Sequence, residues 1–185
     1  MLLGKPALPS YTQGMRLFYG VLFDAATKDN LYKIQDRLEP SLTKGSRTRR
    51  ENLHLTLCFL GERDPSLVET LASLLESIPT FPLDLTFTHL GRFPKRDGDV
   101  IWAGVSHSEE LHELQHQLVS HLMREHIPVE DTSFQAHVTL FRRARGAQLV
   151  PVHPFTTRHC SVALMHSHQE KGVLTYTPLV TKFLQ

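Results

Sequence analysis

Two short motifs in this sequence place a threonine two residues after a histidine. His54 precedes Thr56, and His137 precedes Thr139. Alternate residues of a β-strand point to the same face, so each histidine is expected to project together with its threonine. Imidazole titrates near neutral pH, which lets one histidine accept a proton while another donates one. Two threonine hydroxyls could donate hydrogen bonds to the oxygens of a phosphate group.

These groups suit hydrolysis of a phosphodiester without a metal ion. One imidazole would take a proton from the attacking water, and the other would protonate the departing oxygen. The residues alone do not say which histidine has which role. A purely structural explanation also fits, in which both are half-buried strand histidines, because the chain has 12 histidines. No other histidine is followed two residues later by threonine, which favours the chemical interpretation.

The surrounding pattern predicts a mixed chain of strands and helices. Apolar or alternating stretches predict strands at residues 16–23, 52–60, 83–90, 100–105, 134–141, 156–165 and 173–179. Helical spacing of leucines predicts helices at 25–38, 65–77 and 108–125. Residues 40–50 are polar and predict a loop, and Gly61 is expected to end the second strand. This order lacks the regular alternation of a parallel doubly wound sheet, so it predicts an α+β fold with largely antiparallel sheets.

A weak internal repeat relates the two halves of the chain. Each half contains a predicted helix followed by a strand that carries one His-x-Thr motif. If a pseudo-twofold axis relates the halves, both motifs can face one cleft.

The composition limits the remaining functional classes. The chain has 185 residues, 41% of them hydrophobic, and a net charge of +1. That length fits one ordinary domain or two small lobes that share a core. No run approaches the ~18 apolar residues that a membrane span requires, and residues 1–14 do not resemble a signal peptide. Cys58 and Cys160 form no CxxC pair, so a reducing, cytoplasmic setting is expected. No feature demands more than a monomer.

The segments around both histidines resemble those of the 2H phosphoesterases. Residues 52–57 (NLHLTL), followed by 59–61 (FLG), are similar to the first signature of that family. Residues 137–140 (HVTL), with Arg142 and Arg143 just beyond, are similar to the second, although Ala136 stands where the family often has proline. Further similar segments occur in the same order at 16–18, 91–93, 100–102 and 176–179. The resemblance covers residue 16 to the end and is strongest to the bacterial RNA 2′,3′-cyclic phosphodiesterases, also called 2′-5′ RNA ligases.

This resemblance implies a fold and a reaction. The fold would be a single domain over residues 1–185, with two pseudo-symmetric lobes of antiparallel-rich sheet and outer helices around a central cleft. The reaction would open a terminal 2′,3′-cyclic phosphate on RNA, or on a small nucleotide, to leave a 2′-phosphate. His54 would be the proton donor and His137 the proton acceptor, while Thr56 and Thr139 would hold the phosphate. No cofactor is implied, and the reverse reaction would form a 2′-5′ linkage.

Several basic and aromatic side chains are candidates for contact with RNA. Arginine suits phosphate, and exposed aromatic rings can stack on bases. The candidates are Arg142, Tyr176 and Phe134, with the basic loop Arg47, Arg49 and Arg50 as a further stretch that could follow an RNA backbone. Each also has an ordinary explanation as solvated surface or packing, and core packing is the better interpretation for Phe18.

Two other functional classes stay open at this point. His112-Glu113-x-x-His116 matches the zinc metallopeptidase motif on a predicted helix, but helical geometry turns both histidines toward the polar side. His121 and Glu125 lack the usual spacing for a third zinc ligand. Sensitivity of an activity to EDTA would favour this class. The third class is a non-catalytic RNA-binding module, in which replacing either motif histidine would leave function intact.

Overall fold

The computed structural model describes residues 13–130 and 133–184. Its helices are α1 (Ala25–Leu38), α2 (Val68–Ser77) and α3 (Glu109–Arg124), with short 3-10 turns at Glu39–Ser41, Arg50–Asn52 and Pro65–Leu67. Its strands are β1 (Met15–Leu22), β2 (Lys44–Arg47), β3 (Leu55–Arg63), β4 (Leu85–Phe93), β5 (Asp99–Val105), β6 (His137–Arg145), β7 (Phe155–Thr157), β8 (Ser161–Glu170) and β9 (Val173–Phe183).

All described strands pair antiparallel in one sheet. Their order is β7-β4-β5-β6-β3-β1-β8-β9, and β2 pairs with β6 beside this path. The sheet has two halves that meet where β3 pairs with β6, through Leu55 and Val138. The predicted α+β class with antiparallel strands is therefore confirmed.

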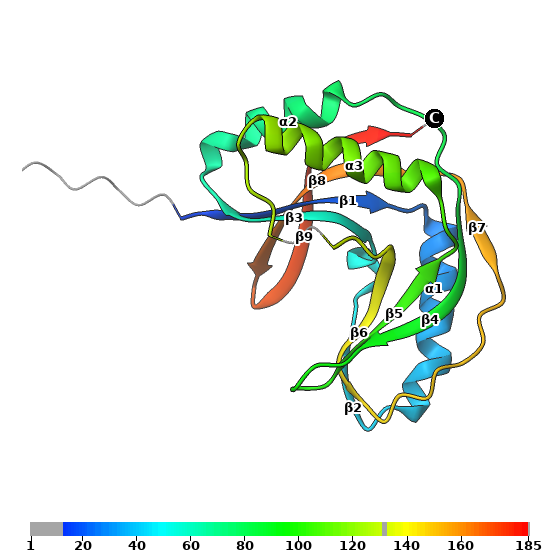
Figure 1. Cartoon of the computed structure of the whole chain (residues 1–185). Helices are drawn as coiled ribbons and strands as arrows, with labels where there is room; N and C mark the ends of the chain where they lie inside the picture. The colour runs from blue at the N-terminus through cyan, green and yellow to red at the C-terminus, as the bar shows by residue number, and fades with distance from the viewer. Residues whose placement is uncertain (1–12, 131–132, 185) are drawn as a thin grey trace, which may run out of the picture.

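The helices cover the two halves of the sheet separately (Figure 1). Helices α2 and α3 lie over the half formed by β1, β3, β8 and β9, whereas α1 packs against β6 in the other half. The predicted leucine faces are buried, as Leu31 of α1, Leu71 of α2 and Leu118 of α3 show. Helix α3 begins as expected, because the hydroxyl of Ser108 accepts from the Leu111 amide at 3.1 Å.

Three local predictions were wrong. Residues 40–50 are not only loop, since they contain β2 and two short turns. Gly61 does not end β3: it has a φ of 71° beside a bulge, and the strand continues to Arg63. The strand predicted at 156–165 is two strands, because β7 pairs with β4 and β8 pairs with β1, far apart in the sheet.

Two expectations from composition can also be compared with the structure. Cys58 and Cys160 are both buried free thiols. Within residues 13–130 and 133–184, no helix combines the length and apolarity needed to cross a membrane.

Candidate active site

His54 lies directly before β3 and is held at both ring nitrogens. Its Nδ1 is 2.7 Å from the carbonyl oxygen of Asn52. A carbonyl can only accept, so Nδ1 carries the hydrogen and Nε2 is left as the nitrogen that can exchange a proton. Nε2 lies 2.9 Å from the hydroxyl of Thr56. The predicted projection of His54 and Thr56 together is confirmed.

His137 is the first residue of β6 and is anchored in the same way. Its Nδ1 donates to the carbonyl oxygen of Gln135 at 2.6 Å. The two histidines therefore share one tautomer, with Nδ1 fixed by a carbonyl two residues earlier and Nε2 available for chemistry. His137 and Thr139 are both half-buried on one face of β6, while the intervening Val138 is buried on the other.

The two motifs meet across the joint of the sheet. Leu55 and Val138, the residues that pair β3 with β6, are the middle residues of the two His-x-Thr motifs. Because the strands are antiparallel, His54 lies across from Thr139, and Thr56 lies across from His137. His54 and Thr139 accordingly line one hollow. The expected pseudo-twofold arrangement of the motifs is thus present around the Leu55–Val138 pair.

Aromatic rings surround each histidine. The ring of His54 lies 4.9 Å from Phe18 and 5.0 Å from Tyr176, measured between centroids. His137 lies 5.1 Å from Phe93 and 5.9 Å from Trp102. These contacts hold both imidazoles in partly apolar surroundings, which disfavour a charged ring.

The surroundings lower the pKa of both histidines. For His54, burial lowers the pKa to about 4, and the carbonyl of Asn52 opposes that shift. The positive charges of Arg142, His137 and Lys28 lower it further. Burial also lowers the pKa of His137, again against its carbonyl hydrogen bond and with help from Arg142. One arginine therefore acts on both imidazoles.

Arg142 and Tyr176 lie in the cleft, as the sequence suggested. Both line the hollow that holds His54 and Thr139, and both also line a second hollow on the β1–β8 side of His54. Arg142 is exposed, and no carboxylate within the described ranges forms an ion pair with it. An uncompensated guanidinium beside two imidazoles is suited to an anionic substrate.

The three arginines of the basic loop form ion pairs with carboxylates of the protein itself. Arg47 bonds to Asp36 at 2.7 Å and to Glu39 at 2.8 Å, and its guanidinium lies 3.7 Å from the ring centroid of Tyr32. Arg50 pairs with Asp29, and Arg49 pairs with Glu51. Arg47 and Arg49 line the hollow that holds His54 and Thr139, but each is already paired with a carboxylate. These ion pairs favour the structural explanation for the three arginines over contact with RNA.

Phe134 is not brought into the cleft with the histidines. It is half-buried against the core, and its ring lies edge-on to His112 at 5.4 Å. Phe18, expected to be a core residue, is buried as predicted, yet it also touches His54.

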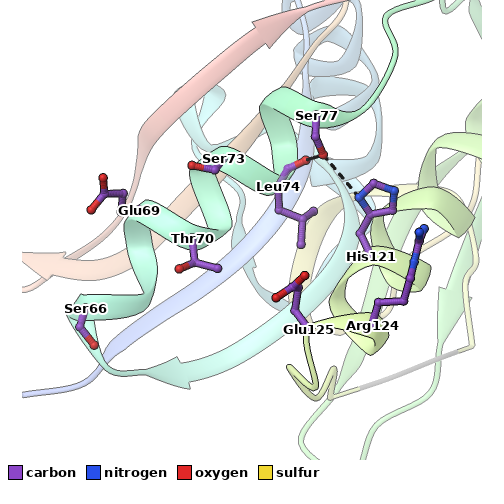
Figure 2. Close-up of a pocket in the computed structure, with 9 residues that line it drawn as sticks. All are labelled: Ser66, Glu69, Thr70, Ser73, Leu74, Ser77, His121, Arg124 and Glu125. Carbon is purple, nitrogen blue, oxygen red and sulfur yellow. Dashed lines mark hydrogen bonds between the residues drawn. The ribbon is translucent and has the colours of Figure 1, made fainter.

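The metallopeptidase motif does not assemble a zinc site. The Nδ1 of His112 donates to the Ser108 carbonyl at 2.8 Å, and Glu113 accepts from Gln117 at 2.8 Å. Within the described ranges, no group of three or more metal-binding side chains comes together. His121 and Glu125 instead line a separate groove between α2 and α3, where Figure 2 shows His121 beside Ser77.

Sequence reasoning missed two residues next to the site. Asn52 is buried, and its Nδ2 donates to the Leu174 carbonyl at 2.9 Å, which ties the start of β9 to the segment that carries His54. Its position two residues before the motif histidine was the available signal. His89 of β4 also lies on the cleft face beside Trp102, at 5.7 Å between centroids, and no local pattern distinguishes it from the other histidines.

Comparisons with known proteins identify the family of this chain. The family profile described as the 2′-5′ RNA ligase superfamily matches residues 27–167. An RNA 2′,3′-cyclic phosphodiesterase of Archaeoglobus fulgidus is 30% identical over 71% of this chain and 74% of that protein. Another, from Escherichia coli, is 27% identical over 91% of this chain and 96% of its own length. The crystal structure of E. coli LigT in apo form superposes with a TM-score of 0.79 and 26% identity, covering 94% of this chain and 99% of that one. The chain belongs to the 2′-5′ RNA ligase superfamily.

Proposed function

We propose that this protein hydrolyses a terminal 2′,3′-cyclic phosphate on RNA and leaves a 2′-phosphate. The observation that carries the proposal is the meeting of two His-x-Thr motifs across the Leu55–Val138 pair. Both imidazoles have their Nδ1 fixed to a backbone carbonyl. The similar proteins of A. fulgidus and E. coli bear the name of this activity.

The proposed mechanism uses the two Nε2 atoms as an acid and a base. The Nε2 of His137 accepts a proton from water while the water oxygen bonds to phosphorus. The bond from phosphorus to the 3′ oxygen breaks, and His54 donates a proton to that oxygen. Thr56, Thr139 and Arg142 hold the non-bridging oxygens, where negative charge grows in the transition state. The choice of His54 as acid comes from the resemblance to the family.

Binding of the substrate supplies the protonation state that this mechanism needs. The low pKa of His54 keeps its ring neutral at neutral pH in the free protein. A cyclic phosphate carries a negative charge, which favours the protonated form of a nearby imidazole and raises its pKa. The bound phosphate therefore favours the state in which one of the two histidines is protonated.

The same groups can also act on an alcohol in place of water. A 5′-hydroxyl of a second RNA would replace water, and its oxygen would bond to phosphorus while the 3′ oxygen leaves. Because the cyclic phosphate is strained, no nucleotide cofactor is needed for this 2′-5′ ligation. Protonation, phosphate binding and charge stabilisation are all assigned to side chains, so the proposed reaction does not depend on a metal.

The direct test uses a short RNA that ends in a 2′,3′-cyclic phosphate, incubated with the protein in EDTA. We expect a 2′-phosphate product, identified by chromatography against 2′- and 3′-phosphate standards. His54→Ala and His137→Ala should each lower turnover on the order of 10²–10⁴-fold, the range for loss of a general acid or base.

His153→Ala is the matched control, because this exposed histidine lies before β7 and outside the cleft. It should keep full turnover, and circular dichroism should show all three variants folded. Turnover that persists in His54→Ala or His137→Ala would refute the proposal. Binding of the RNA without any product would instead support the RNA-binding module.

A further inference from the structure

A third histidine lies in the same row of the sheet as His137. His89 of β4 pairs with Gly104 of β5, and Gly104 pairs with His137 of β6. Residues directly paired on neighbouring strands share a face of the sheet. His89 and His137 therefore flank Gly104 on the face that forms the site, where β4, β5 and β6 run side by side (Figure 1).

The missing side chain at Gly104 gives His89 room to reach toward His137. A Cβ built on Gly104 would lie 2.4 Å from the Nε2 of His89, so the imidazole occupies the space of that side chain. Cβ atoms paired across strands lie about 4.5–5.5 Å apart, which puts the Nε2 of His89 within about 8 Å of the Cβ of His137. A histidine ring reaches several ångströms beyond its Cβ, so one water molecule can bridge the two rings.

The other contacts of His89 leave its Nε2 available. Its Nδ1 lies 2.9 Å from the hydroxyl of Thr88, and its ring stands edge-on to Trp102 at 5.7 Å. Trp102 also contacts His137 at 5.9 Å, so the indole supports both imidazoles. His89 is exposed, whereas the indole is 6% exposed. In the tautomer whose Nδ1–H donates to Thr88, which we adopt for His89, Nε2 presents a lone pair to the cleft.

We propose that His89 binds the nucleophile, accepting a hydrogen bond from the attacking water that His137 deprotonates. This inference rests on the proposed function, because it places the nucleophile on the His137 side of the phosphate. Water has two hydrogens: one moves to His137, and the other stays on the oxygen and points to His89. An alcohol has only one hydrogen on its oxygen, and His137 takes it. His89 therefore selects water over an alcohol.

The test measures how the enzyme divides a cyclic phosphate between water and methanol. The substrate is a nucleoside 2′,3′-cyclic phosphate in buffered water–methanol, and the products are the 2′-phosphate and its methyl diester. His89→Ala should lower the rate of hydrolysis about 5- to 10-fold, the size of one hydrogen bond. The rate of methanolysis should change less than about twofold, so the ratio of methyl diester to 2′-phosphate should rise several-fold.

Two further variants separate hydrogen bonding from packing. His89→Phe keeps a ring over Gly104 without an acceptor and should show the same shift in product ratio. His89→Gln keeps an acceptor and should restore part of the wild-type ratio. An unchanged ratio in His89→Ala, or an equal loss of both products, would overturn the inference. If His54→Ala or His137→Ala kept turnover, the proposed function itself would fail, whatever His89 does.

Discussion

At the scale of single residues, the state of each motif histidine depends on the backbone carbonyl two positions before it. The bonds from His54 to Asn52 and from His137 to Gln135 fix the tautomer and the ring orientation. Burial then lowers both pKa values, while these bonds oppose the change. An imidazole whose ordinary pKa is near 6.5 thereby becomes a weaker base. A bound anion favours its protonated form and raises the pKa again.

Arg142 is the residue through which this balance can be tested. Its charge lowers the pKa of both His54 and His137. Removing the charge in Arg142→Gln favours the protonated rings, so both pKa values should rise. The proposed reaction requires one neutral and one protonated imidazole. The two limbs of the profile of kcat/KM against pH therefore report the pKa values of these groups in the free enzyme. We expect a wild-type optimum below pH ~6.5 and a shift of both limbs to higher pH in the variant.

The same variant should also lose activity at its optimum, because it lacks the proposed contact of Arg142 with the phosphate. We expect a fall in kcat/KM on the order of 10- to 100-fold, as for a charge-assisted hydrogen bond. Arg158→Gln is the control. This exposed arginine lies between β7 and β8 and forms an ion pair with Asp84 at 3.6 Å. If the profile of Arg142→Gln moved to lower pH, Arg142 would not lower the pKa values of His54 and His137 as assigned.

At the scale of elements, the hairpin of β8 and β9 completes the surroundings of His54. Asn52 binds the Leu174 carbonyl, and two residues later the ring of Tyr176 stands edge-on to His54. In Asn52→Ala the hairpin loses this tie, so a ribose or base should be held less well beside His54. We expect KM to rise about 5- to 10-fold with kcat within about twofold, consistent with one lost hydrogen bond.

Steady-state kinetics on a 2′,3′-cyclic nucleotide would measure this split between KM and kcat. Tyr176→Ala should move KM in the same direction, because it removes the ring that the tie positions. A fall in kcat with unchanged KM in Asn52→Ala would show that the residue orients His54 rather than the hairpin.

Elements with a strong local period were predictable, and those that depend on distant pairing were not. The leucine spacing of α1, α2 and α3 gave correct helices, because burial of one face is a local signal. Strand β2 is polar (KGSR) and has no alternation, so only its pairing with β6 makes it a strand. Likewise, β7 and β8 separate because they pair with strands at different places in the sheet.

The same limit applies to the site. The two His-x-Thr motifs were visible locally, and their duplication predicted a shared cleft. Their contact through Leu55 and Val138 is a pairing between residues from different halves of the chain, and no local pattern contains it. His89 was missed because its reach depends on the absent side chain of Gly104 in another strand. The roles of His54 as acid and His137 as base stay predictions.

At the scale of the whole molecule, the site lies on the joint between two separately covered halves of the sheet. Each half supplies one histidine and one threonine, while α1 covers one half and α2 with α3 cover the other. In the proposed reaction, residues of both halves would therefore contact the phosphate at once. We therefore expect such a site to recognise the end of an RNA chain rather than its length.

The distribution of charge argues for the same limited contact with RNA. The net charge is +1, and Arg47, Arg49 and Arg50 are each paired with a carboxylate, whereas Arg142 faces the cleft without an ion pair within residues 13–130 and 133–184. We therefore expect only one or two phosphates to be neutralised. The logarithm of kcat/KM should fall with the logarithm of salt concentration at a slope near −1, given about −0.7 per phosphate for single strands.

The length of the RNA should matter little for the same reason. The kcat/KM values of a dinucleotide and a decanucleotide with the same cyclic end should differ less than about threefold, because most of the longer strand stays in solvent. A slope steeper than about −3, or a tenfold gain with length, would reveal an extended RNA-binding surface that the paired arginines do not provide.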